Sequence, residues 1–209
     1  MSDARARILA RMSQGLGRPC PDTVARVQRE DAPMARQVVH HVADFIARAH
    51  ALQSTTDRVA DMAAVPAAVA RYLRTAHLPL QGVMWPQFAD LDWVAQGLAL
   101  EMRAPQSDDR TGVTGCFCAI AETGTLLLHS GVGLSAAASL LPETHVAVVP
   151  VARIVTRMEQ AFALLRSEVG SVPRALNFIS GPSRTADIEQ TIVIGAHGPR
   201  RVHLIVVDG

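Results

Sequence analysis

Lysine is absent from this sequence of 209 residues, in which all 20 basic side chains are arginine. The absence excludes every mechanism that needs a lysine amine, such as a Schiff base, a phosphate-loop lysine or a Ser-Lys dyad. Arginine still offers a planar, permanently charged group that can hold a carboxylate or a phosphate. The formal net charge is only +1, and the arginines are scattered among carboxylates, so we predict no binding to nucleic acid.

Cysteine is scarce too, occurring only as Cys20, Cys116 and Cys118. An odd count fits a reducing cytoplasm better than a framework of disulfides. Cys116 and Cys118 stand two residues apart, and the three thiols are too few for a zinc or iron-sulfur site of four thiolates. We therefore expect buried, unreactive thiols, no metal site, and no cofactor bound by this chain.

Long apolar runs are also missing, since none approaches the ~20 residues that cross a membrane. We therefore predict a cytoplasmic protein with no membrane insertion. The composition, with 49% hydrophobic and 19% charged residues, is typical of a globular chain, and the length suits one structural domain overall.

Apolar periodicity divides the chain into a helical N-terminal arm, residues 1–53, and an α/β part, residues 54–209. In the arm, helical spacing follows Ser2 and recurs over residues 34–52. From residue 54 the pattern alternates between short apolar strands and helices, which is typical of a parallel sheet with helices on its faces.

The individual elements of the α/β part are predicted from this alternation. Two apolar runs on either side of Glu122 and Gly124 predict an inserted hairpin. The fold class predicted is therefore α/β, with a mainly parallel sheet, flanking helices, one inserted hairpin and a helical N-terminal arm. The other predicted strands cover residues 54–61, 81–85, 144–150, 175–180 and 202–209, and the predicted helices cover residues 65–73 and 154–169.

The stretch FISGPSRTADIE, residues 178–189, carries a dense set of polar groups. It comes after a predicted strand and leads into a possible helix start, where α/β sheets gather ligands and free backbone N–H groups attract anions. Arg184 adds a charged fork, so we predict an anion site here. The structural alternative is that Ser183 or Thr185 caps a helix while Arg184 pairs with a nearby carboxylate. The predicted site consists of Gly181, Ser183, Arg184, Thr185 and Asp187.

Glu122, in AETGT, is the second candidate. A carboxylate at a tight glycine turn between two apolar strands can be partly desolvated, which would raise its pKa and suit it to act as a base or nucleophile. An exposed hairpin tip would leave it an ordinary turn residue.

Two further motifs contain glycine and histidine. HSGVGLSAAASLLP, residues 129–142, resembles a glycine-rich phosphate loop but lacks the third glycine of GxGxxG and the Gly-Lys of a P-loop, so a plain turn is favoured. His197 precedes Gly198-Pro199, a rigid turn that fixes where its imidazole points. If that turn lies beside Arg184, His197 can give a proton to a bound carboxylate.

Taken together, AETGT, GPSRTADIEQTIVIGAHGP and the closing apolar strand resemble the signature of the lactate-utilisation protein C family (LutC/YkgG), whose members carry the LUD domain. The similarity is most specific over residues 111–209. It implies a fold like that of glucosamine-6-phosphate isomerase, ribose-5-phosphate isomerase and CoA transferases. It also implies a role in oxidising L-lactate to pyruvate as one member of a three-protein system, whose partner subunits carry the iron-sulfur clusters.

Three hypotheses for the function are consistent with these motifs. The leading one is a cluster-free subunit of an iron-sulfur system for lactate oxidation, in which Arg184 and its loop bind a small carboxylate or other anion. The second is a free-standing enzyme on a phosphorylated or CoA-linked metabolite, with Glu122 as nucleophile or base. The third is a regulatory binding module without chemistry.

Overall fold

The computed structural model describes residues 7–8, 10–11, 14–15, 41–131, 133–170, 173–186, 192–195 and 197–209. Contacts divide the chain into two compact units, residues 1–38 and 39–209. In the first unit, the described residues are helical. The second unit contains all the strands that the structure describes.

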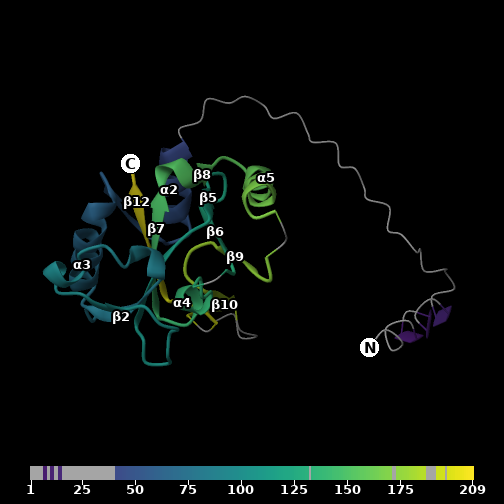
Figure 1. Ribbon diagram of the computed structural model, residues 1–209, viewed down its shortest axis with the longest axis horizontal. Helices are drawn as coiled ribbons and strands as arrows, with labels where there is room; N and C mark the ends of the chain where they lie inside the picture. The colour runs from purple at the N-terminus through teal and green to yellow at the C-terminus, as the bar shows by residue number, and fades with distance from the viewer. Residues whose placement is uncertain are drawn as a thin grey trace. The chain divides into compact units, whose positions relative to one another are not determined.

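A six-stranded sheet, parallel throughout, forms the centre of the second unit (Figure 1). Its order is β1-β12-β7-β4-β2-β3. The central strands β4, β7 and β12 are buried along almost their whole length, as expected for strands covered on both faces. The strands are β1 (Thr55–Val59), β2 (Gln81–Met84), β3 (Ala99–Glu101), β4 (Thr111–Gly115), β7 (Thr144–Pro150) and β12 (Arg201–Val207).

A second sheet of four strands, in the order β8-β5-β6-β9, contains the predicted hairpin. β5 and β6 pair antiparallel, which confirms that hairpin. Its alternate side chains pack on two sides: Leu126 and Leu128 join the main core, whereas Leu127 joins a smaller core against α5. The strands are β5 (Cys118–Ile120), β6 (Thr125–His129), β8 (Ile154–Val155) and β9 (Leu176–Ile179).

In the part of the second unit that the structure describes, four α-helices flank these sheets. α3 contacts β1 and β12, α4 contacts β4 and β7, and α5 contacts β5 and β8 (Figure 1). α2 contacts β1 and β8, one strand from each sheet, and buries Phe45 and Ala49. The bounds are α2 (His41–Ala51), α3 (Val65–Thr75), α4 (Ala137–Leu140) and α5 (Met158–Glu168), with short 3-10 turns η1 (Met62–Ala64), η2 (Pro86–Phe88), η3 (Val94–Gln96) and η4 (Val151–Arg153).

The predicted α/β class with a mainly parallel sheet is confirmed, and two local predictions are wrong. The helix predicted from Ile154 begins at Met158, because Ile154 and Val155 pair with β5 as strand β8. No helix start comes directly after GPS, because Arg184 begins strand β10. The boundary predicted between residues 53 and 54 stays a prediction.

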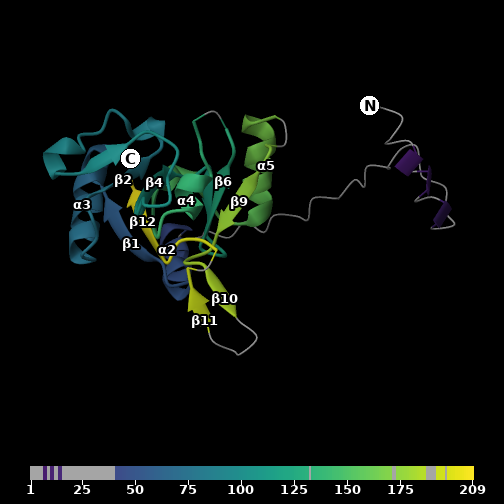
Figure 2. The ribbon, with the colours of Figure 1, turned by 90° about the horizontal axis from the view of Figure 1, so that it is seen from below.

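The β10–β11 ribbon replaces the predicted helix start. β10 (Arg184–Ala186) pairs antiparallel with β11 (Ile192–Ile194), so that Arg184 lies opposite Ile194. Figure 2 shows this two-stranded ribbon extending away from the two larger sheets. The strand before it, β9, pairs antiparallel with β6. The GPSRT segment therefore does not lie at the carboxyl edge of the parallel sheet, which corrects the position predicted from the sequence.

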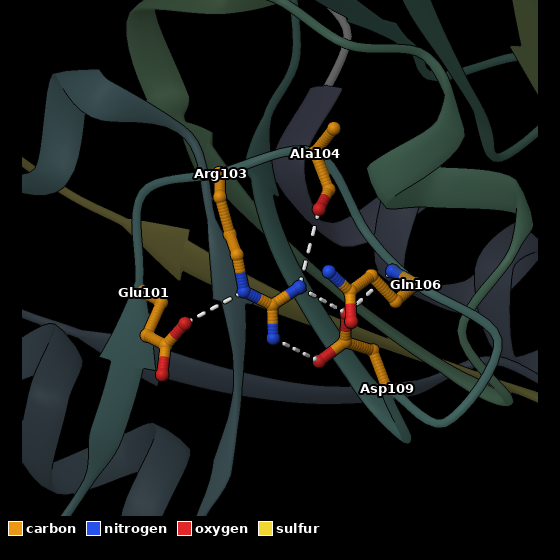
Figure 3. A network of polar contacts seen from close by, with 5 residues as sticks. All are labelled: Glu101, Arg103, Ala104, Gln106 and Asp109. Carbon is orange, nitrogen blue, oxygen red and sulfur yellow. Dashed lines mark hydrogen bonds and ion pairs between the residues drawn. The ribbon is translucent and has the colours of Figure 1, made fainter.

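The connection from β3 to β4 is held by one arginine (Figure 3). Arg103 Nε donates to Glu101, and its two terminal nitrogens donate to Asp109 at 2.6 and 2.9 Å. Asp109 also accepts from the Gln106 backbone N–H at 2.7 Å. The hydrogen bonds from Arg103 are the main reason why the pKa of Asp109 lies below its ordinary value. This network fixes the path by which the chain enters the buried strand β4.

Candidate functional site

Pairing of β6 with β9 brings two of the sequence motifs together. Thr125 of AETGT and Ser180, which precedes GPSRT, share a hydrogen bond of 2.8 Å between their hydroxyl groups. The neighbouring residues Gly124 and Gly181 both have positive φ and lie against the C-terminal end of α2. A Cβ at Gly181 would lie 2.2 Å from the Leu52 carbonyl oxygen. Glycine is required there by both conformation and space.

The HGP turn packs against the same segment. The Ser183 backbone N–H donates to the Pro199 carbonyl at 2.9 Å, and Gly195 N–H donates to the Ser183 carbonyl at 2.9 Å. The HGP turn therefore lies beside the GPSRT loop in the backbone, which is the condition set for a role of His197. The side chains of Arg184 and His197 are both exposed. Asp187 lies outside the described residues, and the side chain of Thr185 is not described.

Glu122 has a structural contact. Its Oε1 accepts a hydrogen bond of 3.0 Å from the backbone N–H of Met158, the first residue of α5. The side chain is exposed, which agrees with the alternative of an ordinary turn residue and not with a partly desolvated carboxylate. A carboxylate beside the N-terminus of a helix is stabilising because it pairs with an otherwise free N–H group. Catalysis by Glu122 or His197 stays a prediction.

A cavity of about 170 Å³ lies at the carboxyl ends of β2, β4 and β7, which are neighbours in the parallel sheet. In open α/β sheets this edge is where ligands bind. The sequence motifs had pointed to a different place, the GPSRT loop. The lining of the cavity comes from the segments that follow those strands, from the last residue of β6 and from the loop after it. It comprises Trp85, Gln87, Cys116, Phe117, His129, Leu134 and Arg153.

Aromatic rings form much of the wall of this cavity, and cationic and polar groups lie against them. The guanidinium carbon of Arg153 lies 5.5 Å from the centre of the Phe117 ring, and the His129 ring meets the Phe117 ring edge to face with centroids 5.2 Å apart. Trp85 is held in place by its indole N–H, which donates to the Ser135 carbonyl at 3.0 Å. The cavity thus brings aromatic side chains together with the cationic and polar groups of Arg153, His129 and Gln87, and its exposed lining is more polar than apolar.

The thiols fit the expectation of low reactivity. Burial raises the pKa of Cys116 to about 12 and that of Cys118 to about 11. Cys116 lines the cavity with its Sγ 3.8 Å from the Val148 carbonyl oxygen. Both groups are protonated thiols near neutral pH, and so they are poor nucleophiles. Cys20 lies outside the described residues.

Metal ligands and membrane spans are two further features that the described part of the chain does not show. No group of three or more His, Cys, Asp or Glu side chains there is placed to hold a metal ion. Within the same residues, no helix combines the length and the apolar character needed to cross a membrane.

The parallel sheet, with a cavity at the carboxyl ends of neighbouring strands, makes this an open-sheet α/β protein. The family model of the LUD domain matches residues 42–207. The chain therefore belongs to the LUD domain family, and the resemblance predicted from AETGT, GPSRTADIE and HGP is confirmed.

Several curated relatives share one name. The chain is 38% identical over 130 residues to "Lactate utilization protein C" of Bacillus licheniformis, an alignment that covers 59% of this chain and 53% of that protein. It is 36% identical over 129 residues to the protein of the same name from Bacillus subtilis strain 168, covering 56% of this chain and 54% of the relative. The matched part spans about half the length of these relatives.

A solved structure has a similar fold. The crystal structure of a DUF162 family protein from Deinococcus radiodurans is 25% identical in sequence and superposes with a TM-score of 0.58. The match covers 80% of this chain and 96% of that one.

Proposed function

We propose that this protein takes part in lactate utilisation as the cluster-free subunit of a system that oxidises L-lactate to pyruvate. The observation that supports this most directly is the identity of 35 to 43% with proteins named "Lactate utilization protein C". The LUD domain match supports it as well, since it covers residues 42–207, most of the second unit.

Oxidation of lactate to pyruvate removes two electrons and two protons, so an electron acceptor is required. The three cysteines of this chain cannot supply the four thiolates of an iron-sulfur cluster. We therefore assign the clusters, and the passage of electrons, to partner subunits. The contribution of this chain is then to bind a small carboxylate or another anion within that assembly.

Residues predicted from the sequence for that binding are Gly181, Ser183, Arg184, Thr185 and Asp187. Exposure of the Arg184 side chain on β10 leaves it accessible to an anion. Its guanidinium can hold a carboxylate through two parallel hydrogen bonds. Replacement of Arg184 by alanine tests this role separately from the role of the whole protein.

Deletion of the gene from its host tests the proposed function. Growth with L-lactate as the carbon source should stop. Growth on pyruvate should continue, because pyruvate is the product of the oxidation. A plasmid copy of the gene should restore growth on lactate. Unchanged growth of the deletion strain on lactate would contradict the proposal.

Copurification tests the proposed partners. An affinity-tagged chain isolated from lactate-grown cells should bring down brown proteins with the visible absorption of iron-sulfur clusters. The same chain expressed alone should be colourless. If the preparation from lactate-grown cells is colourless and contains no partner protein, the subunit assignment is contradicted.

A further inference from the structure

We infer that the cavity at the carboxyl ends of β2, β4 and β7 is the binding site for a small 2-hydroxy carboxylate, with the carboxylate on Arg153 and the hydroxyl on His129. The identity of the acid as L-lactate rests on the proposed function. The location of the site rests on the structure and differs from the Arg184 loop.

The size of the cavity limits what it can take. Its volume of about 170 Å³ is below the ~300–1,000 Å³ of pockets that enclose drug-sized ligands. A three-carbon 2-hydroxy acid has six non-hydrogen atoms, a size that suits so small a space. The cavity is partly open to solvent, and a sugar phosphate or the nucleotide part of coenzyme A would extend out of it.

The charge that recognises a carboxylate comes from Arg153, the last residue of η4 after β7. One of its terminal nitrogens, Nη1, donates to both carboxylate oxygens of Glu168 at 2.8 and 2.9 Å. Among the described residues, Nε and Nη2 have no hydrogen-bond acceptor, so these N–H groups are available to a ligand. The guanidinium carbon lies over the Phe117 ring, 5.5 Å from its centre, in a cation–π contact.

Recognition of a hydroxyl group comes from His129. Its Nδ1 lies 3.0 Å from the Ser130 carbonyl oxygen, which only accepts hydrogen bonds, so Nδ1 carries the proton. In the neutral ring Nε2 is then an acceptor, suited to the hydroxyl group of a 2-hydroxy acid. Arg153 and His129 both lie against Phe117, and all three residues line the cavity.

Gln87 supplies a further polar group, and its position depends on a glycine. A Cβ at Gly115, the last residue of β4, would lie 2.3 Å from the Gln87 side-chain nitrogen. The missing side chain therefore lets the Gln87 amide lie over the end of the strand, at the rim of the cavity. Its N–H groups can donate to a second oxygen of the bound acid.

Calorimetric titration of the purified 209-residue chain with L-lactate, and with propionate as the analogue that lacks the hydroxyl, tests this inference. L-Lactate should bind more tightly than propionate. Arg153→Ala should weaken L-lactate binding by about 10- to 100-fold, the loss of a hydrogen-bonded charge. Arg153→Lys should weaken it as well, because lysine keeps the charge but loses the planar fork.

Two variants separate binding from structure. Glu168→Gln removes the carboxylate that competes for Arg153 and should tighten L-lactate binding. Arg58→Ala is the matched control, because Arg58 also forms an exposed ion pair, at 2.7 Å with Asp208, and lies outside the cavity lining. It should leave the affinity unchanged. Thermal melts of each variant check that the fold is intact.

The inference is overturned if the wild-type chain does not bind L-lactate at millimolar concentration, or if Arg153→Ala and Arg153→Lys bind it as the wild type does. Loss of binding in Arg184→Ala with normal binding in Arg153→Ala would place the site on the GPSRT loop instead. Growth of the deletion strain decides the proposed function independently. A strain that needs the gene for growth on lactate but is fully complemented by Arg153→Ala would remove this site and leave the proposed function standing.

Discussion

His145 is a fully buried imidazole in the central strand β7. The Thr114 hydroxyl donates to the Gly115 carbonyl at 2.9 Å and lies 2.7 Å from His145 Nε2. Because the hydroxyl proton is used on the carbonyl, Nε2 carries the proton that joins the imidazole to Thr114. Thr111, three residues earlier on β4, is equally buried, but its hydroxyl has no hydrogen-bond partner among the described residues.

The two threonines therefore give a matched pair of variants. Thr114→Val leaves the His145 N–H buried without a partner and should lower the free energy of unfolding by about 1–3 kcal/mol. Thr111→Val removes only an unsatisfied hydroxyl and should be neutral or slightly stabilising. Urea unfolding of both variants measures the difference. Equal losses would contradict the hydrogen-bond pattern described for β4.

At the scale of elements, α5 begins where the β5–β6 turn meets it. Glu122 in that turn accepts from the first N–H of the helix, and Gln160 Oε1 accepts from the N–H groups of Thr156 and Arg157 just before it. Glu122→Ala should destabilise the protein by about 0.5–2 kcal/mol, the typical cost of a lost cap. Glu122→Gln keeps an oxygen acceptor and should lose less. Identical thermal melts for wild type and both variants would show that the contact does not stabilise α5.

The turn after β9 offers a second test at this scale. Gly181 and Gly170 have similar positive φ values, 77° and 71°, but only Gly181 has backbone atoms where a side chain would go. Alanine at either position meets the conformational cost of about 1–2 kcal/mol. Gly181→Ala must also displace Leu52, whose carbonyl oxygen would lie 2.2 Å from the new Cβ. We expect a clearly larger loss of stability for Gly181→Ala, measured by thermal or chemical unfolding. Equal losses would show that Leu52, just after the end of α2, moves away from the new Cβ without lowering the stability.

For the whole molecule, two buried imidazoles make stability depend on pH. Burial lowers the pKa of His145 to about 3 and that of His203, stacked on Tyr72 with ring centroids 3.8 Å apart, to about 4. Both are neutral in the folded protein, but in the unfolded chain they take up a proton below about pH 6.5. Since the unfolded state then binds more protons, stability should fall as the pH is lowered from about 6.5 toward 4.

Urea unfolding at pH 7.5, 6 and 5 checks this dependence. Each imidazole contributes at most about 1.4 kcal/mol per pH unit below pH 6.5. His145→Leu removes one of the two groups, and the decrease between pH 6 and 5 should become roughly half as steep. The same decrease in wild type and variant would show that His145 is protonated in the folded protein or does not affect its stability.

Much of the fold could be predicted from local patterns. The spacing of apolar residues predicted β1, α3, β2 and the β5–β6 hairpin, because each spacing reflects contacts within a few residues along the chain. The start of α5 could not be found this way. Ile154 and Val155 have helical spacing with later apolar residues, but they pair with Ala119 and Ile120, more than 30 residues away. That pairing takes them out of the helix.

By itself, the sequence determined the α/β class, the hairpin, the family and the chemistry excluded by missing lysines and scarce cysteines, since all of these depend on residue identity or short-range order. Only the tertiary structure decided that β9 pairs with β6 outside the parallel sheet, and that GPSRT leads into the β10–β11 ribbon.

The tertiary structure also decided which residues meet at the cavity: Gln87, His129 and Arg153 are far apart in the chain. They meet because β2, β4 and β7 lie side by side in parallel and end at one edge, and because β6 ends beside them. Strand order is set by long-range packing, which no local pattern reports.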